Sequence, residues 1–248
     1  MAFLNRVMSV KMTLRRVLYV SYLTPASTIR PHVPDILPLA IVGEDEAFIS
    51  IVCMTCEHVK LSSLPWPSFS YNQLNVRTYV KDPLTGNNAV YFFHSGVTSP
   101  LVSLLTGFSG IPWQHIELSI LHSNDNNLRL SHYSISAEWD GKIDIESGDF
   151  KSELDEMAPF DNPEQAIDYL TGPLIGFIGP EGKTSRFEIR HKALQHLTGR
   201  VYDINFPLIA KSGLLEHERL TNPSNVLLVP EARFTVILPP RRIYGLIG

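Results

Sequence analysis

The stretch Tyr71–Gly96 reads YNQLNVRTYVKDPLTGNNAVYFFHSG and carries the clearest structural pattern in the chain. Its first part, Tyr71–Lys81, alternates between two sets of side chains with the period of two that is typical of a β-strand. The segment Asp82–Asn88 combines Pro, Gly and Asn, which favour turns. Ala89–Gly96 is again rich in β-branched and aromatic residues. The stretch therefore predicts a β-hairpin.

The two faces of the first predicted strand differ in polarity. One face is mostly apolar and is predicted to lie in a core; its members are Leu74, Val76, Thr78 and Val80. The opposite face is polar and aromatic; its members are Tyr71, Gln73, Asn75, Arg77 and Tyr79. In an open sheet the polar face would be solvated, whereas in a closed barrel it could line a cavity. The sequence leaves both alternatives open.

Short apolar runs separated by turn residues continue along the chain. Further strands are predicted at Leu14–Leu23, Ala47–Leu61, Trp113–His122, Leu128–Trp139, Phe187–Leu197 and Val226–Leu238. Helices are predicted at Ala26–Arg30, Pro100–Phe108 and Asn162–Leu170, the last with Asn162 as N-cap, and a weaker one at Leu208–Glu218. The glycine-rich segment Gly172–Pro180 is interpreted as a loop with packing residues.

Strands outnumber helices, and turns join them in sequence. The predicted fold class is therefore mainly β (α+β): a closed or nearly closed antiparallel β-barrel or cone with a central cavity and a few peripheral helices. No composition shift, linker or repeat divides the 248 residues, so residues 1–248 are predicted to form a single domain. Eighteen prolines exclude long helical bundles and coiled coils.

Charge and cysteine content narrow the function classes. A net charge of −4 argues against nucleic-acid binding. No apolar run is long enough to span a membrane, and early basic residues interrupt any signal peptide, so a cytoplasmic location without membrane contact is expected. Cys53 and Cys56 fall inside a predicted strand, where residues three apart point to opposite faces. They are interpreted as buried cysteines rather than a redox or metal pair.

The sequence contains no recognisable cofactor or metal motif. The chain has no P-loop, dinucleotide fingerprint or nucleophile elbow, so no cofactor is predicted. His115 and Glu117 lie on one face of a predicted strand and could supply two metal ligands, but nothing specifies a third. A hydrogen-bonded structural pair is the favoured interpretation, and no metal is predicted.

LNVRTYV (74–80) followed by AVYFFHSGV (89–97) resembles the YqjF-like proteins of unknown function, within the acetoacetate decarboxylase-like superfamily. Val33–Pro38, Asp168–Thr171 and Val229–Tyr244 are similar to other segments of these proteins. The resemblance implies a cone-like antiparallel barrel around a cavity. In the decarboxylases that cavity holds a Schiff-base lysine beside a second lysine, together with a glutamate and an arginine.

The resemblance does not extend to the decarboxylase chemistry. The corresponding segment Leu105–Trp113 contains no lysine, and Lys81 and Lys142 fall in or beside predicted turns. Gln73 takes the place of the glutamate, and the arginine is matched by Arg15 or, with a one-residue shift, by Arg16. Schiff-base decarboxylation is therefore not expected.

The expected function is binding of a small carboxylate- or carbonyl-containing molecule. The predicted ligand-binding residues are Arg15, Gln73, Asn75, Arg77 and Trp113. If the protein is an enzyme, a lyase or isomerase acting by proton transfer is expected, with His115 and Glu117 as acid and base and Tyr71 as oxyanion donor. The alternatives are a non-catalytic binder of the same fold and an interaction module. A homo-oligomer is left open.

Overall fold

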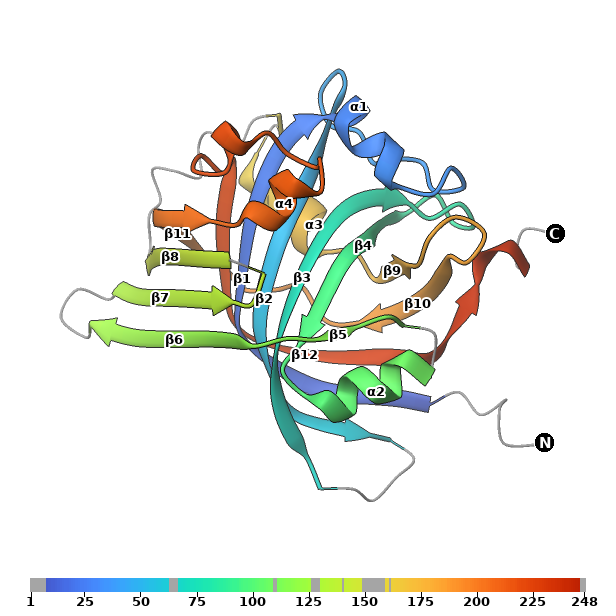
Figure 1. Ribbon diagram of the computed structural model, residues 1–248, viewed down its shortest axis with the longest axis horizontal. Coiled ribbons are helices and arrows are strands. Elements are labelled where there is room, and N and C mark those ends of the chain that lie inside the picture. The colour runs from blue at the N-terminus through green and yellow to red at the C-terminus, as the bar shows by residue number, and fades with distance from the viewer. Residues whose placement is uncertain are drawn as a thin grey trace.

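The architecture is one twelve-stranded sheet whose first part closes into a barrel (Figure 1). The computed structural model describes residues 8–62, 67–108, 111–125, 130–139, 141–148, 159–160 and 162–245. Neighbouring barrel strands run in the order β1, β2, β3, β4, β9, β10, β12, and β12 pairs again with β1. Their bounds are β1 Met8–Pro25, β2 Glu46–Leu61, β3 Phe69–Lys81, β4 Asn88–Val97, β9 Ile175–Ile178, β10 Ser185–Arg190 and β12 Asn225–Arg242.

Four further strands extend the sheet away from the barrel and form a second layer. Continuing from β12, they are β11 (Leu197–Asn205), β8 (Gly141–Gly148), β7 (Leu130–Ala137) and β6 (Leu118–Asp125). In Figure 1, β6, β7 and β8 project to one side of the barrel, with their inner ends next to β1. A two-residue strand, β5 (Gln114–His115), pairs in parallel with the end of β4.

The helices are short and are found in the segments that connect the strands. They are α1 (Ala26–Ile29), α2 (Pro100–Phe108), α3 (Pro163–Thr171) and α4 (Pro207–Lys211), with 3-10 turns at Arg30–His32, His217–Arg219 and Ile243–Gly245. At the start of α3 the Asn162 side chain accepts a hydrogen bond from the amide of Gln165 at 2.9 Å, the predicted N-cap. Within the described part of the chain, no helix is long and apolar enough to cross a membrane.

The barrel wall buries both of its faces, which gives the protein two main cores. One core lies inside the barrel and includes Leu14, Val17, Tyr19, Val52, Tyr71, Tyr79, Leu227 and Val229, with Tyr169 and Leu170 of α3. The other lies between the barrel and the second layer and includes Leu18, Val20, Ile51, Leu74 and Val76 packed with Ile135, Ile143 and Ile145. Alternation along each strand thus sends successive side chains into different cores.

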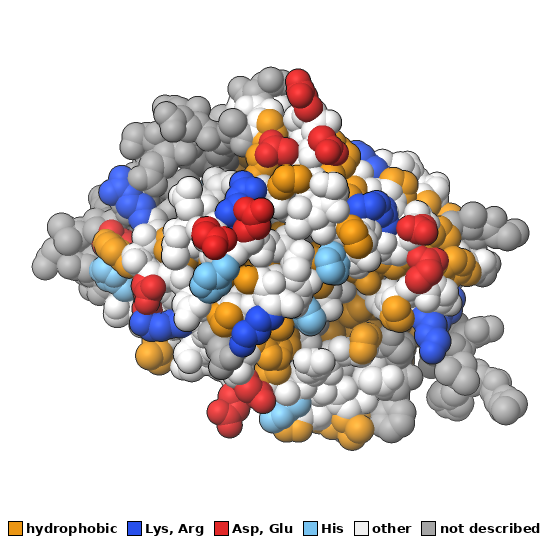
Figure 2. All heavy atoms as spheres, turned by 45° about the horizontal axis from the view of Figure 1, so that its top comes forward, with side chains coloured by type: hydrophobic (Ala, Val, Ile, Leu, Met, Phe, Trp, Pro, Cys, Tyr) orange, Lys and Arg blue, Asp and Glu red, His pale blue; other side chains and the backbone are white. Residues whose placement is uncertain are grey.

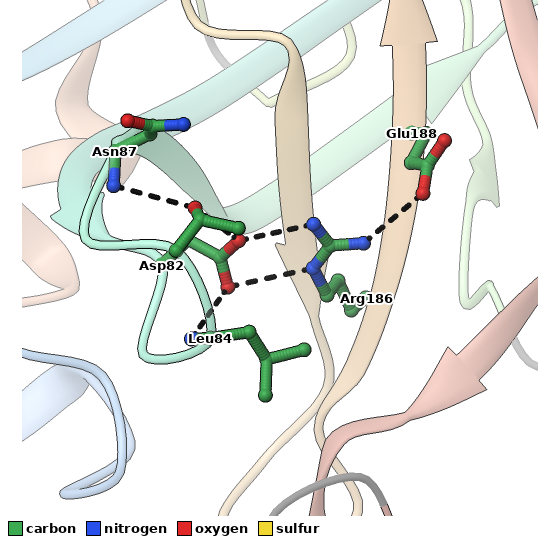
Figure 3. Close-up of polar contacts among 6 residues, drawn as sticks. Asp82, Leu84, Asn87, Arg186 and Glu188 are labelled. Carbon is green, nitrogen blue, oxygen red and sulfur yellow. Dashed lines mark hydrogen bonds and ion pairs between the residues drawn. The ribbon is translucent and has the colours of Figure 1, made fainter.

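A buried ion pair joins the β3–β4 hairpin to β10 (Figure 3). Asp82 is 0% exposed, and its carboxylate accepts from Arg186 Nη2 at 3.0 Å and Nε at 3.4 Å. The hydroxyl of Thr85 and the amide of Leu84 donate to the same carboxylate at 2.8 and 3.2 Å. This set of donors satisfies the Asp82 carboxylate at a point where the hairpin tip meets β10, the second strand from β4 in the barrel order.

The outer surface carries charges of both signs. Figure 2 shows one face on which Lys and Arg side chains are interspersed with Asp and Glu, with hydrophobic side chains between them. Each of the seven described lysines is exposed, and Lys151 lies outside the described residues.

The mainly β barrel, the β3–β4 hairpin and the three more clearly predicted helices are confirmed. The prediction of a loop at Gly172–Pro180 is wrong in part, because Ile175–Ile178 forms β9, which pairs in parallel with β4 and breaks the otherwise antiparallel pattern of the barrel. Gly176 is needed there because a Cβ would lie 2.4 Å from the Phe187 ring. Strand β8 was also missed.

Two other predicted strands have wrong boundaries, both where the chain passes from the barrel to the second layer. Trp113–His122 divides into β5 and β6, and Phe187–Leu197 contains the end of β10 and the start of β11 with no strand at residues 191–196. The strand is interrupted at both places because the chain leaves one layer and enters the other. Residues 126–129, including the predicted start at Leu128, lie outside the described residues.

Candidate functional site

The polar face of β3 points into the barrel, which decides between the two alternatives left by the sequence. Gln73 and Asn75 are only 6% and 3% exposed. Gln73 is in register with Met54 and Val97, which belong to the interior core. The opposite face packs against the second layer, so neither face of β3 is solvated.

Arg77 is the cation of this interior face. Its Nη2 donates to the carbonyl oxygen of Leu170 at 2.8 Å and to the Tyr79 hydroxyl at 3.4 Å. The guanidinium carbon lies 5.3 Å from the centre of the Tyr19 ring and 5.4 Å from that of Tyr79. Leu170 is in the last turn of α3, where the helix dipole favours a positive charge.

Arg77 remains charged in this environment. Burial opposes the charge, but the hydroxyls of Tyr79 and Tyr19 favour it, and the pKa of Arg77 is raised above its ordinary value. The tyrosine rings add cation–π attraction. The barrel therefore holds a permanent positive charge in its interior.

Arg77 has donors that the protein leaves unused. Its Nε is buried and has no hydrogen-bond partner, and the buried Ser95 hydroxyl on the neighbouring strand also has none. Among the described residues, no carboxylate forms an ion pair with Arg77. Buried polar atoms are normally paired, so these two are exceptions on the interior face of β3 and β4.

Arg77 also keeps some accessible surface, although it is deep in the molecule. Its side chain is half-buried, while its neighbours Val76 and Thr78, on the opposite face of the strand, are 0% exposed. The accessible surface of Arg77 therefore faces the barrel interior.

Hydrogen bonds hold the remaining interior polar groups. The Ser50 hydroxyl lies 2.7 Å from that of Ser21 and 2.9 Å from that of Tyr79. Tyr79 in turn donates to the Leu170 carbonyl at 3.1 Å. This network fixes Tyr79 beside Arg77, so the guanidinium is held in a rigid frame.

A second network lies further along β3. Gln73 Nε2 donates to Asn75 Oδ1 at 3.1 Å, and the Cys56 thiol donates to Gln73 Oε1 at 3.7 Å. Burial, and then the adjacent Cys56, raise the pKa of Tyr71 well above its ordinary value, so its phenol stays protonated. Burial likewise raises the pKa of Cys56 to about 12.

Cys53 and Cys56 are both free and buried, as predicted. Cys53 packs in the core between the layers and Cys56 in the barrel core, so they point to opposite faces of β2. In the part of the chain that the structure describes, no group of three His, Cys, Asp or Glu residues could hold a metal ion.

Arg15 and its alternative Arg16 do not reach the barrel interior, so their predicted place in the cavity is wrong. Arg15 Nε lies 2.8 Å from Glu57 and its Nη1 lies 2.9 Å from Glu231 on the outside of the wall. The physical reason is a bulge at Arg16, which has a φ of 53°. The residues that point inward on either side of the bulge are Leu14 and Val17.

His115 and Glu117 are not brought to the interior polar face either. Both are exposed, and the Glu117 amide donates to Glu138 Oε2 at 3.1 Å. Strand β5 ends at His115 because the chain leaves the barrel there for the second layer. The expectation that they face the ligand as an acid–base pair is therefore wrong, and so is the placement of both on one strand.

Trp113 is placed at the barrel interior, as expected for a residue lining it. It is half-buried and packs against the interior core and the small cluster around Phe187. Its carbonyl accepts from the Ser103 hydroxyl of α2 at 2.8 Å. Within Leu105–Trp113, the segment that corresponds to the lysine pair of the decarboxylases, Ser109 and Gly110 lie outside the described residues.

Ser95 and Tyr19 are interior residues that the sequence interpretation missed. Ser95 is opposite Asn75, but only because the β3–β4 register shifts between Val76 and Arg77. If the pairing of Lys81 with Asn88 at the turn continued without that shift, His94 would lie opposite Asn75. The alternation of side chains in β1 would have predicted that Tyr19 points inward if the bulge at Arg16 had been recognised.

Comparisons with known proteins agree with this architecture. The model of the DUF2071 family, described as an uncharacterized conserved protein (COG2071), matches residues 11–232. No curated protein matches the chain.

Several solved structures are similar over almost the whole chain. The enduracididine biosynthesis enzyme MppR complexed with pyruvate has a TM-score of 0.56 at 11% identity, covering 98% of this chain and 92% of that one. Acetoacetate decarboxylase from Legionella pneumophila has a TM-score of 0.52 at 10% identity, and the match covers 94% of this chain and 86% of that one. An acetoacetate decarboxylase-like enzyme from Sphingomonas wittichii RW1 has a TM-score of 0.53 at 10% identity, and the match covers 94% of this chain and 92% of that one. The chain thus has an acetoacetate decarboxylase-like fold and belongs to the DUF2071 family.

Proposed function

We propose that the barrel interior binds a small molecule with a carboxylate or a polarised carbonyl group, and that Arg77 is its anion-binding residue. The observation that carries this proposal is a buried, charged guanidinium with a free Nε and no carboxylate partner among the described residues. A buried cation without an anion is costly, and a bound carboxylate would remove that cost. Arginine also suits a carboxylate because it can donate two parallel hydrogen bonds.

The residues around Arg77 fit the rest of such a ligand. Ser95 has an unused hydroxyl, and Asn75 beside it presents a side-chain amide. Tyr19 and Tyr79 pack against the guanidinium, so the ligand that we propose is a small one. Pyruvate, which has a carboxylate next to a carbonyl, is bound by the similar enzyme MppR and is therefore a suitable probe here.

Binding is better supported than proton-transfer catalysis. The buried carboxylates of the described residues are Asp82, which is paired with Arg186, and Glu146, which lies in the second layer. Tyr71 is the interior group that could donate a proton to a developing oxyanion, but its raised pKa makes it a hydrogen-bond donor rather than a base. A lyase or isomerase remains the alternative proposal, with Tyr71 as the oxyanion donor.

Isothermal titration with pyruvate and with acetoacetate tests the proposal. We expect saturable binding to the wild type and an affinity about 10- to 100-fold lower for Arg77→Met, the loss typical of a charge-assisted hydrogen bond. Arg190→Met, which changes an exposed arginine of β10, is the matched control and should bind like the wild type. Equal affinities for all three proteins, or no binding to any, would refute the proposal.

A further inference from the structure

A separate hollow lies between the barrel wall and the second layer. It has a volume of about 590 Å³, within the range of small-molecule sites. The barrel side contributes Arg16, Glu57 and Leu228, and the second layer contributes His122, Tyr133 and Leu197. We refer to it as the interlayer groove.

Two adjacent arginines face this groove, and their pairing differs. Arg15 is held by two carboxylates, Glu57 at 2.8 Å and Glu231 at 2.9 Å. Arg16 approaches only the other oxygen of Glu57, at 3.9 Å, and its buried Nε has no hydrogen-bond partner. The groove therefore contains a guanidinium with unused donors, next to one that is already satisfied.

The backbone holds Arg16 in this position at an energetic cost. A φ of 53° is unusual for a residue other than glycine and costs about 1 kcal/mol or more. The bulge there puts Arg15 and Arg16 on the same outer side of the wall, between the inward-pointing Leu14 and Val17. Without the bulge, Arg16 would point into the barrel.

The opposite wall of the groove is aromatic and apolar. The rings of His122 and Tyr133 lie 4.7 Å apart, and Leu197 is 37% exposed there. Burial and then the charge of Arg16 lower the pKa of His122, which favours its neutral imidazole. The groove thus combines one available positive charge with surfaces that fit an apolar group.

We propose that the interlayer groove is a second binding site, for an organic anion that carries an apolar group, with its anionic end on Arg16 and its apolar part against Tyr133, Leu197 and Leu228. This site is outside the barrel and does not depend on the ligand proposed for Arg77. An amphipathic carboxylate of modest length can contact both the guanidinium of Arg16 and the apolar wall of the groove. An inorganic anion can contact only the guanidinium.

Titration with sodium octanoate, followed by NMR of the His122 ring protons and by calorimetry, tests this site. We expect saturable binding that shifts the His122 signals, and an affinity at least 10-fold weaker in Arg16→Gln. Inorganic phosphate should bind more weakly than octanoate, and octanol should also bind more weakly. Leu197→Gln should weaken octanoate binding without affecting phosphate.

Two further variants distinguish binding through Arg16 from binding elsewhere on the molecule. Arg15→Gln is the matched control for charge, and it should affect octanoate less than Arg16→Gln, because Arg15 is already paired. Arg77→Met should leave octanoate binding unchanged while it weakens pyruvate binding in the barrel. The proposal is overturned if Arg16→Gln, still folded by its thermal transition, binds octanoate like the wild type, or if Arg77→Met removes octanoate binding.

Discussion

Arg186 and Arg77 both point away from bulk solvent in the same barrel, but their partners differ. The Arg186 side chain is 14% exposed and donates two hydrogen bonds to the fully buried Asp82 (Figure 3). Arg77 contacts a helix carbonyl and two tyrosines, and its Nε has no partner. One guanidinium is neutralised within the chain, and the other is not.

The difference separates a structural arginine from one available to a ligand. Buried ions are stable in proteins when they are paired and hydrogen-bonded, as Asp82 and Arg186 are. The charge of Arg77 is instead stabilised in the interior by weaker partners, a helix C-terminus and aromatic rings. This partial compensation allows Arg77 to stay buried without a carboxylate of the described chain as its partner.

The largest expected effect is on stability, at the paired arginine. Arg186→Met leaves the Asp82 carboxylate buried without a cation, which should lower the free energy of unfolding by about 3–5 kcal/mol. Urea denaturation followed by fluorescence measures this difference. A loss below about 1 kcal/mol would mean that Arg186 is no more structural than Arg77, and the contrast between them would disappear.

The pH dependence of stability provides a second comparison. Burial raises the pKa of Asp82, but hydrogen bonds from Arg186, Thr85 and Leu84 outweigh it, so the pKa lies below its usual value. The stabilisation is therefore full above the unfolded-state pKa of about 4 and is lost as the pH falls towards the folded-state pKa. Between pH 5 and pH 2 the wild type should lose more stability than Asp82→Asn. Parallel curves for the two proteins would contradict this assignment.

Arg77→Met should have a much smaller effect on the stability of the ligand-free protein. The variant loses a hydrogen bond to Leu170 but also removes an unpaired buried charge, so the net change should be within about 1 kcal/mol in either direction. Urea denaturation beside Arg186→Met tests this. A loss as large as that of Arg186→Met would show that Arg77 is mainly structural.

Ser95→Ala is expected to have the smallest effect on stability. Its hydroxyl has no hydrogen-bond partner, so the folded protein should change by less than about 0.5 kcal/mol or become slightly more stable. Pyruvate affinity should nevertheless fall about 3- to 10-fold, since the hydroxyl would donate to the ligand. An affinity like that of the wild type would remove Ser95 from the site.

Period-two alternation was enough to predict the barrel strands on either side of β3 and to separate its polar face from its apolar one, but not to decide which face is interior. Gln73, Asn75 and Arg77 were placed correctly because β3 is regular on their side and both of its faces had to be buried. Arg15 and its alternative Arg16 were placed in the cavity by the family resemblance; a bulge at Arg16 leaves both outside the barrel, and no residue type in β1 marks that bulge.

His115 and Glu117 illustrate a different limit of sequence patterns. Their alternation was interpreted within one continuous strand, but the chain changes layer between β5 and β6. Such a crossing depends on how two sheets pack together, which local periodicity does not record. The predicted residues of β3 thus lie on the interior face of the barrel, whereas His115 and Glu117 do not.

The central claim is that the free Nε–H of Arg77 is the donor for a carboxylate in the barrel. The most direct measurement is the proton–nitrogen NMR signal of Arg77 Nε during titration with pyruvate, assigned by its loss in Arg77→Met. The account predicts a saturable shift of this signal, with the same dissociation constant as calorimetry and no shift of the Arg186 Nε signal. An Arg77 signal that stays in place while pyruvate binds elsewhere would contradict it.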